Sequence, residues 1–199
     1  RMSEVNQGFI RRYVFSLDHK VIGIQYIVTG LVMALIGGFL ASLIRLQLAF
    51  PGRQWPMLEA LLPTGFMGGI MAPEFYLATV TMHGTIMVFL AIVPLAFAAF
   101  GNYVVPLQIG APDMAFPKLN MASYWCYFAG GVVMLASFLI PGGAAKSGWT
   151  SYSPLATVAD LAHRFDGQTF WLMGMVLLIT SSLLGSVNFI ATIIQLRVP

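Results

Sequence analysis

His83 is a residue of this sequence that could do chemistry from within an apolar run. It lies in the segment Thr81-Met82-His83-Gly84. If this run spans a membrane, a polar side chain there is costly and therefore points to a function. Imidazole is a good ligand for haem iron, and Gly84 leaves room for a bulky planar group near the backbone. The alternative is a core histidine hydrogen-bonded to a neighbouring helix. Spacing alone leaves both interpretations open.

A later apolar run carries Ser181, Ser182 and Asn188. Ser181 and Asn188 are two helical turns apart, so they share one face and lie about 10 Å apart along the axis. Hydroxyls and amides stacked in this way could line a file of water molecules. They could also form hydrogen bonds between helices, which is the commoner use of Ser and Asn in membrane bundles.

Asp113 lies in a short connection between two apolar runs, with Asn102 before it and Asn120 after it. A lone carboxylate at the rim of a membrane can collect protons. It can equally be an ordinary loop aspartate. His19, which precedes the first apolar run beside Lys20, is interpreted as a structural residue.

The overall composition indicates which elements position these residues. Of the 199 residues, 58% are hydrophobic and only 9% are charged, and the mean hydropathy is +0.83. A soluble domain carries about 25% charged residues, so the sequence predicts an integral membrane protein. The net charge is +3, but the ten Lys and Arg residues are spread along the chain and form no nucleic-acid patch. The single Cys126 cannot form an internal disulfide.

Four apolar stretches are long enough to cross a bilayer, which takes about 20 helical residues. Their length and the absence of alternation favour helices over a barrel. We predict transmembrane helices over residues 21–45, 79–105, 119–140 and 170–196. The distribution of Lys and Arg favours a cytoplasmic N-terminus. Residues 1–20 are then a cytoplasmic segment, 106–118 an inner loop, and 46–78 and 141–169 outer loops. Because the chain ends at Pro199, directly after the fourth stretch, we expect a continuation.

The amino-acid sequences of several segments are more specific than the spacing of their polar residues. The sequence closely resembles the N-terminal third of cytochrome c oxidase subunit I, in the haem–copper oxidase superfamily. The segments that carry the resemblance are Asp18–Gly23 (DHKVIG), Thr81–Phe89 (TMHGTIMVF), Gly101–Pro117 (GNYVVPLQIGAPDMAFP) and Gly185–Ile190 (GSVNFI). The resemblance implies an all-α membrane protein whose four helices match the first four of about twelve.

The resemblance also implies roles for individual residues. His83 would be an axial ligand of the low-spin haem, for which an a-type haem is favoured. Arg45 would lie near the edge of that haem, where it could hydrogen-bond a formyl group. Trp149 and Tyr152 would be outer-loop residues near the binuclear centre.

A proton-uptake path is implied by the same resemblance. Asp113 would form its entrance, and Asn102 and Asn120 would lie just above it. Ser181, Ser182 and Asn188 would order the water chain that follows.

The complete subunit of this family needs further ligands. The second ligand of the low-spin haem, the ligand of the high-spin haem and the three copper-binding histidines all lie beyond the fourth helix. This chain alone is therefore not expected to reduce oxygen. It is expected to be part of the catalytic subunit of a respiratory terminal oxidase. That enzyme would pass electrons from cytochrome c through the low-spin haem to a haem–copper centre. There O2 would be reduced to water, coupled to proton uptake and pumping.

The resemblance implies partners and a location as well. The expected partners are a copper-bearing electron-entry subunit, subunit III, cytochrome c as donor and membrane lipid, with no nucleic acid. A bacterial cytoplasmic membrane is favoured over the mitochondrial inner membrane.

Two alternatives remain open. A quinol oxidase of the same superfamily would carry a histidine and a glutamine shortly before the haem-ligand histidine, where this sequence has Phe75 and Ala78. Cytochrome c is therefore the preferred donor. The other alternative is a non-catalytic four-helix membrane scaffold, which haem content would distinguish.

Overall fold

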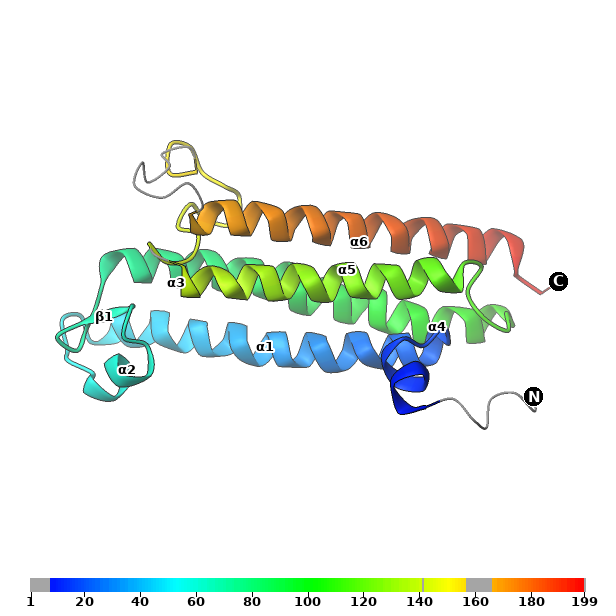
Figure 1. Cartoon of the computed structure of the whole chain (residues 1–199), viewed down its shortest axis with the longest axis horizontal. Coiled ribbons are helices and arrows are strands. Elements are labelled where there is room, and N and C mark those ends of the chain that lie inside the picture. The colour runs from blue at the N-terminus through cyan, green and yellow to red at the C-terminus, as the bar shows by residue number, and fades with distance from the viewer. Residues whose placement is uncertain (1–7, 141, 157–165, 199) are drawn as a thin grey trace.

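Four long helices lie side by side in the computed structural model, which describes residues 8–140, 142–156 and 166–198 (Figure 1). Within this described part, the helices long and apolar enough to cross a membrane run His19–Ala49, Pro73–Ile109, Pro117–Leu139 and Gly167–Gln195. The predicted all-α membrane fold is confirmed. Residues 1–7 of the predicted N-terminal segment, and 141 and 157–165 of the second predicted outer loop, lie outside the described residues.

Two of these helices begin at aspartate caps. Helix α1 (His19–Ala49) follows Asp18, whose carboxylate accepts a hydrogen bond from the Lys20 amide at 2.7 Å. Helix α6 (Gly167–Gln195) follows Asp166, which accepts from the Thr169 amide at 2.8 Å. Such caps satisfy amides that have no partner in the first turn. They explain why both helices begin two or three residues before the apolar stretches at 21 and 170.

The second long helix is a continuous rod made of four segments: α3 (Pro73–Thr85), η2 (Ile86–Ile92), η3 (Pro94–Ala99) and α4 (Phe100–Ile109). It begins six residues before the predicted position 79. Pro73 starts it, because the first helical position needs no N–H and suits the fixed backbone of proline. The rod ends at Gly110, whose φ of 72° is the left-handed conformation that glycine adopts at helix ends.

The middle of this rod is wider than an α-helix. Segments η2 and η3 are π-helical, and Pro94 starts the second of them. Proline lacks the N–H that an α-helix needs at this position, so the regular hydrogen-bond ladder cannot continue through it. The apolar spacing of the sequence did not predict this change of register.

Helix α5 (Pro117–Ala136) continues into the short 3₁₀ segment η4 (Ser137–Leu139). It packs along α6, and the two backbones lie close together at a pair of glycines. A Cβ atom on Gly130 would lie 3.1 Å from the carbonyl oxygen of Gly174. Small residues of this kind allow membrane helices to approach closely.

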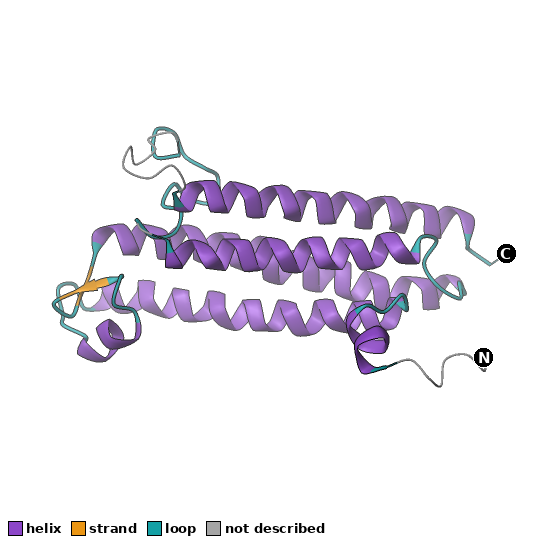
Figure 2. Cartoon of the chain, viewed as in Figure 1, coloured by secondary structure: helices purple, strands orange, loops and turns teal. Residues whose placement is uncertain are grey.

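The connections at the end of the bundle opposite the chain termini contain short elements (Figure 2). Helix α2 (Pro56–Leu61) and a hairpin of β1 (Phe66–Met67) and β2 (Ile70–Met71) lie between α1 and α3. The sequence predicted this segment only as a loop. Lys146 of the loop before α6 forms an ion pair with Glu74 at 2.6 Å, which ties that loop to α3.

Candidate functional site

His83 lies on α3, where it is the eleventh residue of the rod, and not the fifth as the predicted bounds would have it. Its Nδ1 is 2.9 Å from the carbonyl oxygen of Gly37 on α1. Because a carbonyl oxygen can only accept, Nδ1 must carry the hydrogen. In the neutral ring the lone pair is then on Nε2, which is the form in which imidazole binds a metal.

Glycines allow the surroundings of His83 to be closely packed. A Cβ atom on Gly37 would lie 2.6 Å from Sδ of Met87, so α1 approaches the rod closely at this point. A Cβ atom on Gly84 would lie 3.3 Å from the indole of Trp149. The structure therefore places Trp149 directly over the neighbour of His83. Tyr152 follows in the same loop, and its side chain is exposed.

Arg45 lies eight residues after Gly37 on α1, which is about 12 Å along the helix axis. Its side chain is exposed. Among the described residues, Lys146 and Glu74 form the only ion pair, so Arg45 has no carboxylate partner there. The guanidinium is therefore free to contact a group beside the bundle.

Asp113 lies at the opposite end, in the connection between α4 and α5. Its carboxylate accepts a hydrogen bond from the Met114 amide at 2.7 Å. Burial raises the pKa of Asp113 above its ordinary value, while the Met114 amide and the nearby His19 offset part of this effect. A carboxyl with a raised pKa at the end of a membrane bundle can bind and release protons closer to neutral pH.

Two side chains of α6 hold the Asp113 connection in place. Oδ1 of Asn188 accepts from the Phe116 amide at 2.9 Å, and its Nδ2 donates to the Phe116 carbonyl at 3.3 Å. Thr192 accepts from the Ala115 amide at 2.9 Å. The observed hydrogen bonds of Asn188 are thus those of an interhelical contact. Its role in a water chain stays a prediction.

Asn102 and Asn120 are both almost fully buried. Asn102 donates to the Ala98 carbonyl at 2.7 Å, but its Oδ1 has no partner among the described residues, and neither has Nδ2 of Asn120. His19 donates from Nδ1 to the backbone carbonyl of Asn102 at 2.7 Å. His19 therefore lies in the group around Asp113. The sequence predicted a structural role for His19 but did not predict that it belongs to this group. Buried polar atoms without partners are costly unless water satisfies them.

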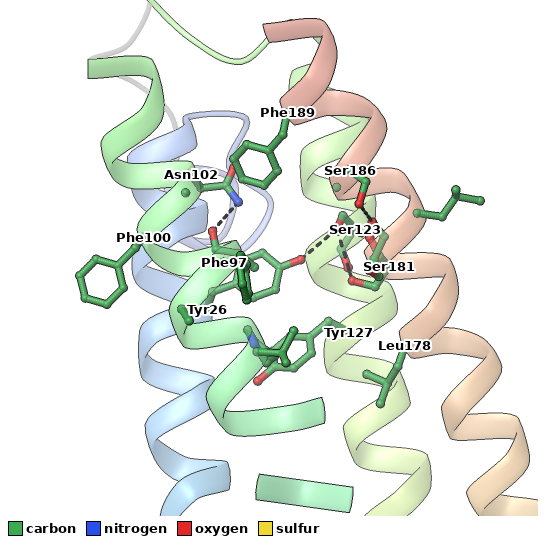
Figure 3. Close-up of a pocket in the computed structure, with 18 of the residues that line it drawn as sticks. Tyr26, Phe97, Phe100, Asn102, Ser123, Tyr127, Leu178, Ser181, Ser186 and Phe189 are labelled. Atoms are coloured by element: carbon green, nitrogen blue, oxygen red, sulfur yellow. Dashed lines mark hydrogen bonds between the residues drawn. The ribbon is translucent and has the colours of Figure 1, made fainter. Parts of the chain in front are cut away.

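A cavity of about 1180 Å³ separates the rod from α6 (Figure 3). Aromatic rings of Phe97, Phe100 and Phe189 form part of its wall. Its polar lining brings together the predicted Asn102, Ser181 and Ser182 with four residues that were not predicted: Tyr26, Ser123, Tyr127 and Ser186.

The polar part of the cavity wall is a hydrogen-bonded cluster. The Tyr26 hydroxyl is 3.0 Å from Oγ of Ser123, which donates to the Ser181 carbonyl at 2.8 Å. Ser181 donates in turn to the Ser123 carbonyl at 2.7 Å. The cluster joins α1, α5 and α6. Tyr26 and Ser123 could have been found in the sequence as hydroxyls within predicted spans.

His83 and the group around Asp113 therefore lie towards different ends of the bundle, and Ser181 and Ser182 lie near the middle of α6. His83 and Asn102 are 19 residues apart on the same rod, which separates them by on the order of 25 Å. No cluster of three or more His, Cys, Asp or Glu side chains able to hold a metal occurs in the ranges that the structure describes. His83 is accordingly a single potential metal ligand.

Comparisons with known proteins identify relatives over nearly all of the chain. Residues 21–199 match the family model described as cytochrome C and quinol oxidase polypeptide I. The chain is 46% identical over 187 residues to cytochrome c oxidase subunit 1 of Thermostichus vulcanus, and 41% identical over 186 residues to that of Synechocystis. A probable cytochrome c oxidase subunit 1-alpha of Streptomyces coelicolor is 43% identical over 189 residues. These matches cover 94% of this chain, but the chain spans only about 30% of the length of the relatives.

Proposed function

The chain belongs to the cytochrome c and quinol oxidase polypeptide I family, and we propose that it forms the haem-binding and proton-entry part of a respiratory terminal oxidase. In this proposal, the complete subunit would receive electrons from cytochrome c through a low-spin haem. When bound, a haem–copper centre would supply the reduction of O2 to two molecules of water with four electrons and four protons, and proton pumping would accompany it.

The observation that carries this proposal is the orientation of His83. The Gly37 carbonyl fixes the hydrogen on Nδ1, so Nε2 is available as an axial ligand. The ring is only partly buried in the four-helix bundle, so Nε2 need not be enclosed by these helices. His83 Nε2 would bind the iron of a low-spin haem, and that haem would supply single-electron transfer when bound.

Other residues at this end of the bundle would shape the haem environment. Arg45 would lie beside the haem edge and donate to a formyl group, as an a-type haem carries. Trp149 and Tyr152 would approach the binuclear centre from the outer loop. The second axial ligand and the ligands of the high-spin haem and copper would come from outside this chain.

Proton uptake is proposed to begin at Asp113. Its raised pKa suits a group that takes up protons at the membrane rim. The unpartnered atoms of Asn102 and Asn120 could contact water above it, and the cavity beside Ser181 and Ser182 could hold the water chain that continues inward. Asn188 would hold the loop that carries Asp113.

The proposed setting is a multi-subunit complex in a bacterial cytoplasmic membrane. A copper-bearing electron-entry subunit and subunit III are the proposed partners. The relatives above are bacterial, which supports this location over the mitochondrial inner membrane.

The haem proposal can be tested in the complete complex purified from its host. We expect His83→Ala to abolish the low-spin haem band in reduced-minus-oxidised spectra of the purified complex. His19→Gln is the matched control, because His19 is a histidine at the other end of the bundle. The control should retain that band. A normal haem spectrum in His83→Ala would contradict the assignment and would favour the scaffold alternative.

The proton-entry proposal needs a separate variant. We expect Asp113→Asn to slow proton uptake during turnover and to leave the haem spectrum intact, because the carboxylate lies far from His83. Unchanged turnover together with an unchanged number of protons taken up per O2 would exclude this role.

Packing around the candidate quinol positions supports cytochrome c as the donor. Ala78 is buried, and the Phe75 ring packs between Phe66 and Phe138, with ring centroids 6.0 and 6.4 Å away. An apolar, filled position of this kind offers no hydrogen bond to a quinol headgroup. Oxidation rates measured with each donor would decide, and preferential oxidation of quinol would reverse this choice.

A further inference from the structure

The segment that precedes α1 folds back along the bundle. It contains the short π-helix η1 (Ile10–Val14), drawn in dark blue in Figure 1 beside the end of α1. Nε2 of Gln25 donates to the carbonyls of Tyr13 and Val14 at 2.6 and 3.0 Å. Gln25 is six residues into α1, so η1 lies about 9 Å inward from the start of that helix.

A second, independent contact places the segment at a similar distance from the end of the bundle. The Phe15 ring stacks on the Trp125 ring of α5, with centroids 5.1 Å apart and an angle of 27° between the planes. Trp125 is eight residues into α5, which is about 12 Å from the start of that helix. The segment therefore lies beside the bundle, about 9 to 12 Å in from the starts of α1 and α5, and not beyond the end of the bundle.

The outer surface of this segment combines apolar and cationic side chains. Phe9 and Ile10 are 73% and 63% exposed, and Arg11 and Arg12 are exposed beside them. A hollow of about 460 Å³ is lined by Gly8, Phe9, Ile10, Arg11 and Phe15. Its wall is therefore apolar except for one guanidinium. That combination fits a phospholipid, whose phosphate can pair with arginine while its acyl chain contacts the rings.

The charge of this end of the bundle favours an anionic lipid. Among the described residues, this end has five basic and two acidic side chains, a net charge of +3. They are Arg11, Arg12, Lys20, Lys118 and Arg197, with Asp18 and Asp113. The opposite end has three of each sign, so its net charge is zero: Arg45, Arg53 and Lys146, with Glu59, Glu74 and Asp166. A positively charged end is complementary to the anionic lipids of a cytoplasmic leaflet.

We propose that residues 8–17 form a binding site for an anionic phospholipid, with Arg11 on the phosphate, Arg12 adding positive charge beside it, and Phe9 and Phe15 on an acyl chain. The site includes none of the residues assigned to the haem or to proton entry, and its test does not depend on oxidase activity.

The test measures lipid binding to the protein as its host makes it. The purified protein is placed in nanodiscs of phosphatidylcholine containing a small fraction of phosphatidylglycerol, and the phosphatidylglycerol retained after transfer to mild detergent is counted by native mass spectrometry. We expect the double variant Arg11→Gln/Arg12→Gln to bind phosphatidylglycerol about thirtyfold more weakly, because two surface charges are removed. Arg53→Gln, which removes an exposed arginine at the opposite end, should bind it like the wild type.

Trypsin provides a second readout, because it cleaves after exposed arginines. Cleavage after Arg12 should be slower in nanodiscs that contain phosphatidylglycerol than in nanodiscs of phosphatidylcholine alone. Equal retention of phosphatidylglycerol by the double variant and the wild type would overturn the proposal. It would also be overturned by a rate of cleavage after Arg12 that is the same with and without phosphatidylglycerol.

Discussion

The hydroxyl of Tyr127 on α5 donates a hydrogen bond of 2.6 Å to the backbone carbonyl of Leu90 in the wide segment of the rod. Leu90 lies four residues before Pro94, which has no N–H to offer this carbonyl in an α-helical register. Tyr127 is almost fully buried, so the bond is shielded from water. A side chain of one helix therefore supports the backbone of another helix where a proline interrupts it.

Tyr127→Phe should lower the free energy of unfolding by about 0.5–1.5 kcal/mol, because the Leu90 carbonyl loses a buried donor while the ring packing is retained. Thermal unfolding of the purified protein in detergent would measure this. Tyr103→Phe is a suitable control, since Tyr103 is 39% exposed. Equal melting temperatures for Tyr127→Phe and the wild type would show that the bond contributes nothing.

Gly130→Leu should separate α5 from α6. Its side chain would have to occupy the space next to the Gly174 carbonyl, which is backbone and cannot rotate away. Overpacking of this kind costs about 1–3 kcal/mol. Gly38→Leu is the matched control, because nothing lies within 4 Å of a Cβ atom at Gly38. If both variants melt at the same temperature, the close approach of the two helices is not required.

Asn188→Leu should loosen the loop that carries Asp113, because it removes both hydrogen bonds to the Phe116 backbone. We expect a loss of about 1–2 kcal/mol in stability and faster amide exchange at residues 114–116. Ser186→Ala, on the same helix, should change neither, since Ser186 bonds only to the Ser182 carbonyl of its own helix. Unchanged exchange in Asn188→Leu would instead favour a role confined to the water chain.

Ionisation of Asp113 should lower the free energy of unfolding as the pH rises. Its pKa is raised in the folded state, so the folded protein binds this proton more tightly than the unfolded chain does. The stabilisation by the neutral carboxyl is therefore present below the unfolded-state pKa and is lost as the pH rises through the folded-state pKa. We expect Asp113→Asn, which cannot ionise, to gain stability relative to the wild type between acidic and neutral pH. Parallel melting curves across this range would contradict the raised pKa.

The spans could be predicted from the sequence because apolar length alone determines whether a helix can cross a bilayer. The ends of the helices could not be predicted in this way, because Pro73 and the aspartate caps extend the helices beyond the apolar stretches. His83 was found because a lone imidazole in an apolar run is unusual. The bond from its Nδ1 to Gly37, 46 residues earlier, depends on helix packing, which spacing along one chain does not reveal. The same is true of Asn188 and Phe116, which are 72 residues apart.

The number of residues between positions 86 and 99, where the rod has wide π-helical turns, determines how the two ends of the rod are oriented relative to each other. A π-turn holds one residue more than an α-turn, so deletion of a single residue that left these wide turns in place would change the angle between the two ends of the rod. Each residue turns an α-helix by about 100°, and such a deletion would rotate everything on one side of it relative to the other. His83 and Asn102 lie on opposite sides of this stretch. A one-residue gap would therefore misalign one functional end of the bundle, even though no functional side chain had been altered.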